Sequence, residues 1–171
     1  CAPCLDLATD VTHPFLKKRC YGTDMKAVSA LGRATADGHL AGGVLPVIKH
    51  MPGHGRANAD THHDLPCVTT DAETLRATDF AAFRALNDLP LAMTAHIIYS
   101  AFDDQPATCS ASMMRVMREE IGFAGLIMSD DLNMQALSGS LEQRAARAIA
   151  ACCDIALHCK GTLAEFAATA K

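Results

Sequence analysis

Several features that mark particular classes of protein are missing from the sequence. No uninterrupted apolar run approaches the ~20 residues of a membrane span, and no stretch has the pattern of a signal peptide. The formal net charge of −4 comes with neither a basic patch nor an acidic tail. We therefore expect neither a membrane nor a nucleic acid among its partners.

A second CxxC motif is also missing, although the chain has eight cysteines. Cys1 and Cys4 form one CxxC, but no other pair completes a zinc site with them. Most of the cysteines lie in apolar segments, and a chain that is 50% hydrophobic can build its core without disulfides. We predict free, buried thiols in a reducing cytoplasm, and we expect no metal and no cofactor.

Segments typical of strands and of helices alternate along the chain. Apolar runs predict strands at 2–8, 43–50, 91–100, 125–131 and 154–159. Caps and periodicity predict helices at 24–41, 70–87, 111–121, 140–152 and 162–170, the second and fourth opened by capping boxes of Thr70 with Glu73 and Ser140 with Gln143. Continuously apolar strands are typical of a parallel sheet covered on both faces by helices, so the predicted fold class is α/β.

Polar or ionisable residues follow the expected strands where each one ends. They are Asp6, then Lys49 and His50, then His96 and Tyr99, then Asp130 and Asp131, and finally His158. Parallel sheets of α/β proteins place their ligands outside the carboxyl ends of the strands. One or two such residues could simply cap strands or begin helices, but the whole series favours a shared site.

Residues 49–66, "KHMPGHGRANADTHHDLP", form an almost entirely polar segment with four histidines, called the histidine loop below. His50 and His54 have the spacing of a helical metal pair, but Pro52 and Gly53 between them exclude a helix, and the glutamate of the zincin motif is missing.

Acid–base chemistry is the other interpretation of this loop. Asp60 lies two residues before His62, where its carboxylate could fix the imidazole tautomer and favour the protonated form. A turn-capping Asp60 and a solvated His62 explain this doublet equally well.

An apolar strand also delivers Ser129, Asp130 and Asp131 to its carboxyl end. One aspartate could cap a helix, but two adjacent ones repel each other unless one has another task. A carboxylate at a strand end could act as a nucleophile. The pair could instead hold Mg²⁺, although no glycine-rich phosphate loop accompanies it.

Several stretches together resemble glycoside hydrolase family 3, in particular the bacterial NagZ-type β-N-acetylglucosaminidases of peptidoglycan recycling. They are "KHMPGHG…ADTHHDLP", "MTAHIIYS", "IGFAGLIMSDDLNM", "APCLDLATDV" and "KRCYGTD". The resemblance covers essentially the whole chain. It implies exo-acting release of N-acetylglucosamine (GlcNAc) from GlcNAc-anhydro-muropeptides in the cytoplasm.

The resemblance further implies a retaining hydrolysis in two steps. By the motif match, Asp130 would attack the anomeric carbon and form a covalent glycosyl-enzyme. His62 would protonate the leaving oxygen and later deprotonate water, oriented by Asp60. Asp131 would serve only to cap a helix.

Substrate-binding residues also follow from the motif match. Arg19, Lys49 and His50 would hold the hydroxyls and the acyl group of the sugar ring. The fold implied is a partial (β/α)8 TIM barrel of about five βα units, strands four to eight, with residues 1–171 as a single incomplete catalytic domain. Family members carry an Asp-Gln-Glu-Gly-Gly segment and an arginine on earlier strands, and this sequence has neither.

Three alternatives stay open at this point. A phosphorylase would use phosphate in place of water, because a histidine acid/base does not repel an anionic acceptor. A metal-dependent hydrolase would use His50, His54, His62 and Asp60 as ligands. A non-catalytic scaffold would only expose the edges of its sheet.

We predict that the 171-residue chain by itself is weakly stable and inactive, because an open five-stranded sheet would expose apolar faces and unpaired edges. The measurement is turnover of an aryl N-acetylglucosaminide by the purified chain and by a longer parent. Robust turnover by the 171-residue chain would refute the prediction.

Overall fold

The computed structural model describes residues 1–170 as a mixed α/β structure with parallel sheets. The strands are β1 (Val47–Met51), β2 (Cys67–Val68), β3 (Leu91–Thr94), β4 (Ile98–Tyr99) and β5 (Leu126–Met128). The helices are α1 (Pro14–Lys17), α2 (Met25–Ala41), α3 (Ala72–Ala77), α4 (Asp79–Arg84), α5 (Ala111–Arg115), α6 (Leu141–Ala150) and α7 (Leu163–Thr169).

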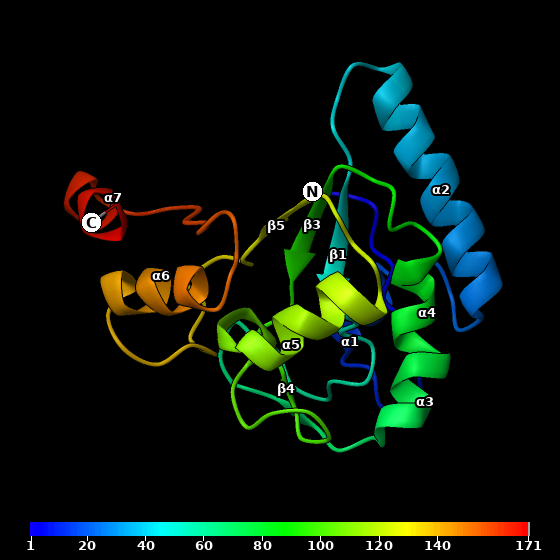
Figure 1. Ribbon diagram of the computed structural model, residues 1–171, viewed down its shortest axis with the longest axis horizontal. Helices are drawn as coiled ribbons and strands as arrows, with labels where there is room; N and C mark the ends of the chain where they lie inside the picture. The colour runs from blue at the N-terminus through cyan, green and yellow to red at the C-terminus, as the bar shows by residue number, and fades with distance from the viewer. Residues whose placement is uncertain (171) are drawn as a thin grey trace.

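The main sheet has the order β1-β3-β5, and all of its strands are parallel (Figure 1). Val47 and Leu126 both lie beside Leu91, which sets the register. Two further segments extend this order by single parallel bridges, Cys4 to Lys49 at one edge and Met128 to Ile155 at the other. Five segments therefore run side by side in the order of the sequence.

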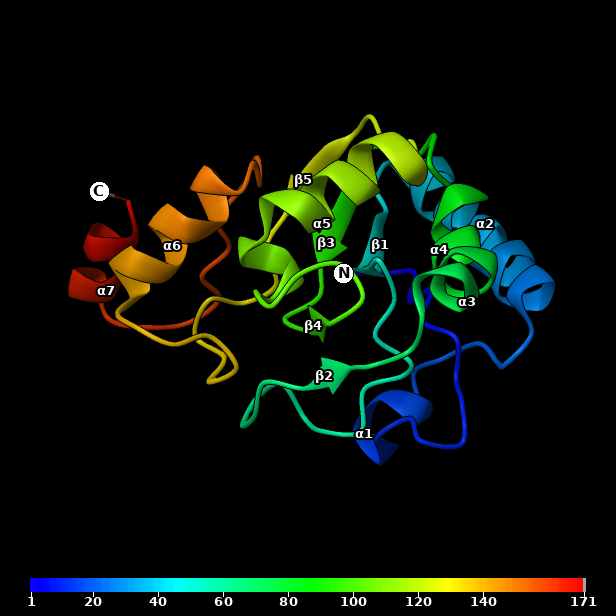
Figure 2. The ribbon, with the colours of Figure 1, turned by 60° about the horizontal axis from the view of Figure 1, so that its bottom comes forward.

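Some expected strands are shorter than predicted or absent. Segments 2–8 and 154–159 make only these single bridges, so neither is a regular strand. The strand expected at 91–100 ends at Thr94, because the chain turns where Thr94 and His96 each bond the Thr108 hydroxyl at 2.7 Å. Its last part is β4, which pairs with β2 in a small sheet beyond the main one (Figure 2).

Two helices begin as the sequence predicts. Asp24 caps α2 by accepting a hydrogen bond from the Ala27 amide at 2.8 Å. Ser140 and Gln143 form the expected capping box of α6. Because these caps depend only on local spacing, sequence patterns locate them well.

The helix expected at 162–170 is continuous as α7, whereas two other predicted helices are interrupted. The helix expected at 70–87 divides at Thr78, whose backbone leaves the helical region and whose hydroxyl bonds Asp79. Its cap is Asp71 rather than the predicted capping box of Thr70, because the Asp71 carboxylate accepts from the Thr74 amide. The helix expected at 111–121 is α5 followed by a π-helical turn, Val116–Glu120.

The core lies between the main sheet and the helices that cover its outer side (Figure 2). Its largest wholly buried side chains are Tyr99, Phe80, Phe83, Phe123, Leu5, Leu16 and Ile48. Apolar side chains also lie exposed near the amino ends of the strands and on the last two helices, namely Val44, Leu45, Leu126, Ile149, Leu163 and Phe166. No helix within residues 1–170 is both long and apolar enough to cross a membrane.

All eight cysteines, which lie within the described residues, are free thiols, as predicted. The prediction that they are buried is only partly right. Cys4 and Cys153 are buried, whereas Cys1, Cys67, Cys152 and Cys159 are exposed. Apolar neighbours in the sequence do not guarantee burial where a segment follows the edge of the sheet.

Gly55 fixes how the histidine loop passes against the N-terminal segment. A Cβ atom at this position would lie 1.7 Å from the carbonyl oxygen of Leu7. The hydroxyl of Thr12 donates to the Gly55 carbonyl from the same side. The two backbones therefore touch directly, and no side chain fits between them.

We predict that Gly55→Ala destabilises the folded protein by ~3 kcal/mol or more, because the added methyl group must push backbone apart. Gly38→Ala is the matched control, since Gly38 lies in α2 with no atom within 4 Å of the new Cβ. That change should stabilise the protein by ~0.5–1 kcal/mol. Chemical denaturation measures both, and equally small effects would contradict the described loop path.

Candidate active site

A cavity of about 290 Å³ lies at the carboxyl ends of the strands in the main sheet. It brings together five of the six residues that the sequence proposed for the site, namely Arg19, Lys49, His50, His62 and Asp130. The sixth, Asp60, does not line the cavity but holds His62 at its rim. Residues from widely separated parts of the chain thus meet around one space.

Asp130 projects into this cavity from the end of β5. Its side chain is 17% exposed, and its Oδ2 lies 3.9 Å from Nε2 of His50. The other carboxylate oxygen accepts a hydrogen bond from the Asp131 amide at 2.8 Å. One oxygen of Asp130 therefore remains available toward the cavity and His50.

Asp131 lies in a turn and does not cap a helix, which corrects the sequence prediction. Its carboxylate accepts from the backbone amides of Asn133 and Cys159, each at 3.1 Å. These bonds tie the end of β5 to the segment after the last bridge of the sheet. They explain why two adjacent carboxylates are tolerated, because each one has its own backbone donors.

Asp60 and His62 form the hydrogen-bonded pair that their spacing suggested. Nδ1 of His62 lies 2.7 Å from Oδ1 of Asp60, which also accepts from the His62 amide at 3.0 Å. Burial alone would raise the pKa of Asp60, but these two hydrogen bonds hold it below its usual range. Asp60 is thus an ionised partner that fixes the His62 tautomer with Nε2 free.

The segment that carries His62 rests on the loop after β5. The amides of Gln135 and Ala136 donate to the carbonyls of His62 and Thr61 at 3.4 and 3.3 Å. The Phe15 ring packs edge-on against the imidazole of His62 with 5.9 Å between ring centroids. The imidazole itself stays 59% exposed, so it can meet a group that enters from solvent.

Two cations, Arg19 and Lys49, also line the cavity. The guanidinium of Arg19 lies 6.0 Å from the centroid of the Phe15 ring. Burial, and then the positive charge of Arg19, lower the pKa of Lys49 from its usual value. Both side chains can donate hydrogen bonds to hydroxyl, carbonyl or anionic oxygens of a ligand.

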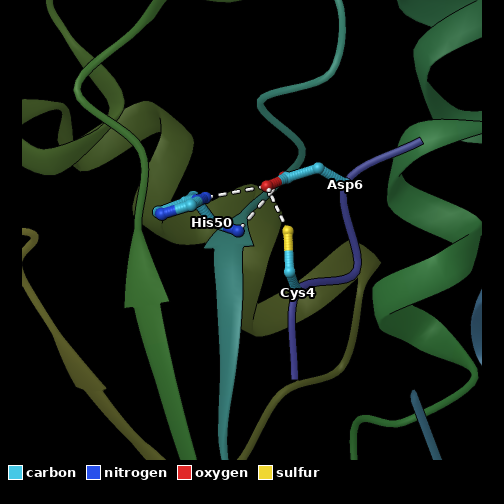
Figure 3. A group of neighbouring side chains, drawn as sticks. All are labelled: Cys4, Asp6 and His50. Carbon is cyan, nitrogen blue, oxygen red and sulfur yellow. Dashed lines mark hydrogen bonds and ion pairs between the residues drawn. The ribbon is translucent and has the colours of Figure 1, made fainter. Parts of the chain in front are cut away.

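A buried carboxylate, Asp6, anchors His50 from behind (Figure 3). Oδ2 of Asp6 lies 2.7 Å from Nδ1 of His50 and also accepts from the Cys4 thiol at 3.1 Å. Oδ1 accepts from the backbone amides of His50 and His54 at 3.1 and 2.7 Å. Burial alone would raise the pKa of Asp6, but the charge and hydrogen bonds of these histidines hold it well below its usual range.

The same trio is the one group of possible metal ligands that the described residues bring within 4.8 Å of each other. A thiolate, a carboxylate and an imidazole would suit zinc. However, the carboxylate already accepts four hydrogen bonds, and two of them come from backbone amides. These buried amides would lose their acceptor if a metal ion took their place on the carboxylate. The four histidine-loop ligands of the metal-hydrolase alternative do not gather around one point in the described chain.

Three of the residues that follow strand ends do not line the shared site that the sequence predicted. His96 is buried beside the cavity and bonds the Asp131 carbonyl at 3.1 Å. The Tyr99 hydroxyl donates to the Gly53 carbonyl at 2.7 Å inside the core. His158 does not line the cavity and packs on Phe166 instead, with 4.6 Å between ring centroids.

Sequence reasoning missed the apolar wall of the cavity, formed by Phe15, Met93, Met134 and Leu157. Phe15 lies in α1, a four-residue helix that was not predicted. An aromatic residue two positions after a histidine carries no recognisable signal in a short polar segment. Only the path of the chain brings it to the rings of His54 and His62.

The glycosyl hydrolase family 3 N-terminal domain matches residues 1–171. The chain belongs to glycosyl hydrolase family 3. The resemblance that the sequence motifs indicated is thereby confirmed.

Individual relatives of this family 3 chain agree with the match. The beta-hexosaminidase of Bordetella pertussis is 36% identical over 168 residues, which are 95% of this chain and 47% of that protein. A family 3 β-N-acetylglucosaminidase structure from Paenibacillus sp. FPU-7 superposes with a TM-score of 0.93 at 32% identity, over 99% of this chain and 34% of that chain.

A structure of NagZ from Neisseria gonorrhoeae, solved in complex with N-trifluoroacetyl-D-glucosamine, superposes with a TM-score of 0.84 at 34% identity. It covers 93% of this chain and 46% of that chain. The family 3 chain described here therefore spans about half the length of the curated relatives that it matches.

His54 gives the free energy of unfolding a predicted pH dependence. Burial, followed by the charge of His50, lowers the pKa of His54 from 6.5 to about 4. Between these values the unfolded chain binds a proton that the folded protein rejects, so the free energy of unfolding falls as the pH is lowered. The loss is at most about 1.4 kcal/mol per pH unit.

We expect His54→Gln to flatten this dependence, measured by urea denaturation between about pH 4 and pH 6.5. Burial also lowers the pKa of His96, which remains in both proteins, so the difference between them isolates His54. An unchanged slope in the variant would show that His54 is not the responsible group.

Proposed function

We propose that this chain carries the catalytic site of a retaining exo-β-N-acetylglucosaminidase. The observation that supports this most strongly is one cavity lined by both Asp130 and His62, with His62 oriented by Asp60. A carboxylate nucleophile and an imidazole acid, held in different environments, meet the requirement for two groups with separate acid–base tasks.

In the first step, an oxygen of Asp130 attacks the anomeric carbon of GlcNAc and the bond to the leaving oxygen breaks. His62 gives its Nε2 proton to that oxygen, so the aglycone leaves as a neutral alcohol. The ionised Asp60 stabilises the imidazolium before transfer and keeps Nδ1 protonated afterwards. The product of this step is a covalent ester between the sugar and Asp130.

In the second step, a water molecule attacks the same anomeric carbon. Neutral His62 takes a proton from this water, and the ester bond to Asp130 breaks to restore the carboxylate. Two inversions at one carbon give net retention. The partly exposed position of His62 at the rim allows water to reach it after the aglycone leaves.

Arg19, Lys49 and His50 would hold the sugar. They line the same cavity as Asp130, so hydrogen bonds to ring hydroxyls and the acyl group would aim the anomeric carbon at the nucleophile. The apolar wall of Phe15, Met93 and Met134 would exclude bulk water from the reacting carbon.

The fold is proposed to be part of a (β/α)8 barrel, with the five adjacent segments as strands four to eight and residues 1–171 as one incomplete catalytic domain. The parallel order of these segments and the cavity at their carboxyl ends support this assignment. In the relatives, the remaining strands of the barrel would lie in the part of the protein that this chain does not match.

The natural substrate is proposed to be a GlcNAc-anhydro-muropeptide, processed in the cytoplasm during peptidoglycan recycling. The support is the similarity to beta-hexosaminidases and to NagZ. Phosphate in place of water is a second candidate acceptor, favoured by the two cations Arg19 and Lys49 in the cavity. Analysis of products with and without phosphate separates the two acceptors.

We predict that Asp130→Asn in the natural full-length protein lowers kcat for an aryl N-acetylglucosaminide by at least about a thousandfold. A 2-fluoro sugar that traps the ester should label Asp130, as identified by mass spectrometry of the peptide. Asp37→Asn, on the exposed side of α2, is the control and should keep wild-type turnover. Labelling of Asp131 instead, or undiminished turnover, would overturn the assignment.

A further inference from the structure

We propose that Asp6 is a positioning residue that aligns the nucleophile side and the acid side of the site through two histidines, an inference that rests on the function proposed above. Asp6 does not line the cavity and therefore does not touch a substrate. Its carboxylate lies behind the end of β1, with no exposure to solvent.

The hydrogen bonds of Asp6 determine which atom of His50 faces the cavity. Oδ1 of Asp6 is used by two backbone amides, which can only donate. Oδ2 lies 2.7 Å from Nδ1 of His50, and an ionised carboxylate can only accept, so Nδ1 carries a proton. The other ring nitrogen, Nε2, is thereby directed at Asp130, 3.9 Å away.

The second connection of Asp6 leads to the acid side. Its Oδ1 accepts from the His54 amide at 2.7 Å, which fixes the turn after β1. Nε2 of the His54 ring lies 3.4 Å from the hydroxyl of Thr61, the residue between Asp60 and His62. The Phe15 ring packs against the imidazoles of both His54 and His62. A shift of the turn would therefore displace the imidazole of His62, the proposed acid.

An asparagine at position 6 would have nearly the same shape as Asp6. Its NH₂ group would donate hydrogen bonds where one carboxylate oxygen of Asp6 accepts them. Its single oxygen would stay on the two backbone amides, and its NH₂ group would then face Nδ1 of His50. Nδ1 would have to accept, so the proton would move to Nε2. Asp6→Asn therefore changes the His50 tautomer beside Asp130 without removing any bulk.

The first test is a double-mutant cycle in the natural full-length protein, with kcat/KM for an aryl N-acetylglucosaminide as the readout. We expect Asp6→Asn to lower kcat/KM at least tenfold in the wild-type background and less than threefold when His50→Gln is already present. Groups that act through one another are non-additive in this way. Equal losses in both backgrounds would overturn the proposal.

Asp79→Asn is the matched control for a buried carboxylate. Asp79 also has no exposed side-chain surface, but its carboxylate bonds Arg56 at 2.6 Å and Thr78 at 2.8 Å rather than His50 and His54. Its loss should lower the melting temperature and combine additively with His50→Gln. Coupling as strong as that of Asp6 would show that the cycle reports only general destabilisation, and would overturn the proposal.

A second measurement reads the His50 tautomer directly, and its wild-type part requires no variant. In ¹⁵N-histidine NMR of the wild-type protein, Nδ1 of His50 should be protonated, and Asp6→Asn should move that proton to Nε2. An unprotonated Nδ1 in the wild-type protein would overturn the proposal. Labelling of Asp130 by the 2-fluoro sugar is scored separately, so a failure of the proposed function is distinguished from a failure of the Asp6 role.

Discussion

A carboxylate with no contact to solvent must find its hydrogen-bond donors inside the protein, and Asp6 finds four of them at the start of the histidine loop and in its own segment. This requirement joins the N-terminal segment to the end of β1. It also fixes the first turn of the loop that later carries Asp60 and His62. The placement of the polar site thus depends on one buried charge.

The parallel sheet supplies the second constraint. Because its strands run in the same direction, side chains at their carboxyl ends, such as Lys49, His50 and Asp130, open onto the same cavity. The strands alone would leave this site open to solvent. The loop that rests on Gln135 and Ala136 brings the imidazole of His62 over its rim.

Local patterns in the sequence predicted the parts of this site that depend on short spacing. Short spacing suggested the pair Asp60 and His62 and the strand-end Asp130, and the resemblance to family 3 then selected their catalytic roles. Phe15 could not be predicted, because only the tertiary path of α1 brings it to the cavity. His158 was placed wrongly in the shared site, because the last segment makes one bridge and its side chain packs on Phe166.

The break at Thr78 was missed for a similar reason, since Arg56 from the histidine loop bonds its hydroxyl from outside the helix.

The most direct test of the proposed mechanism is a crystal structure of the natural full-length protein with GlcNAc bound. We expect the anomeric carbon to lie about 3–3.5 Å from an oxygen of Asp130, with His62 on the leaving-group side. A sugar bound with its anomeric carbon out of reach of both residues would contradict it.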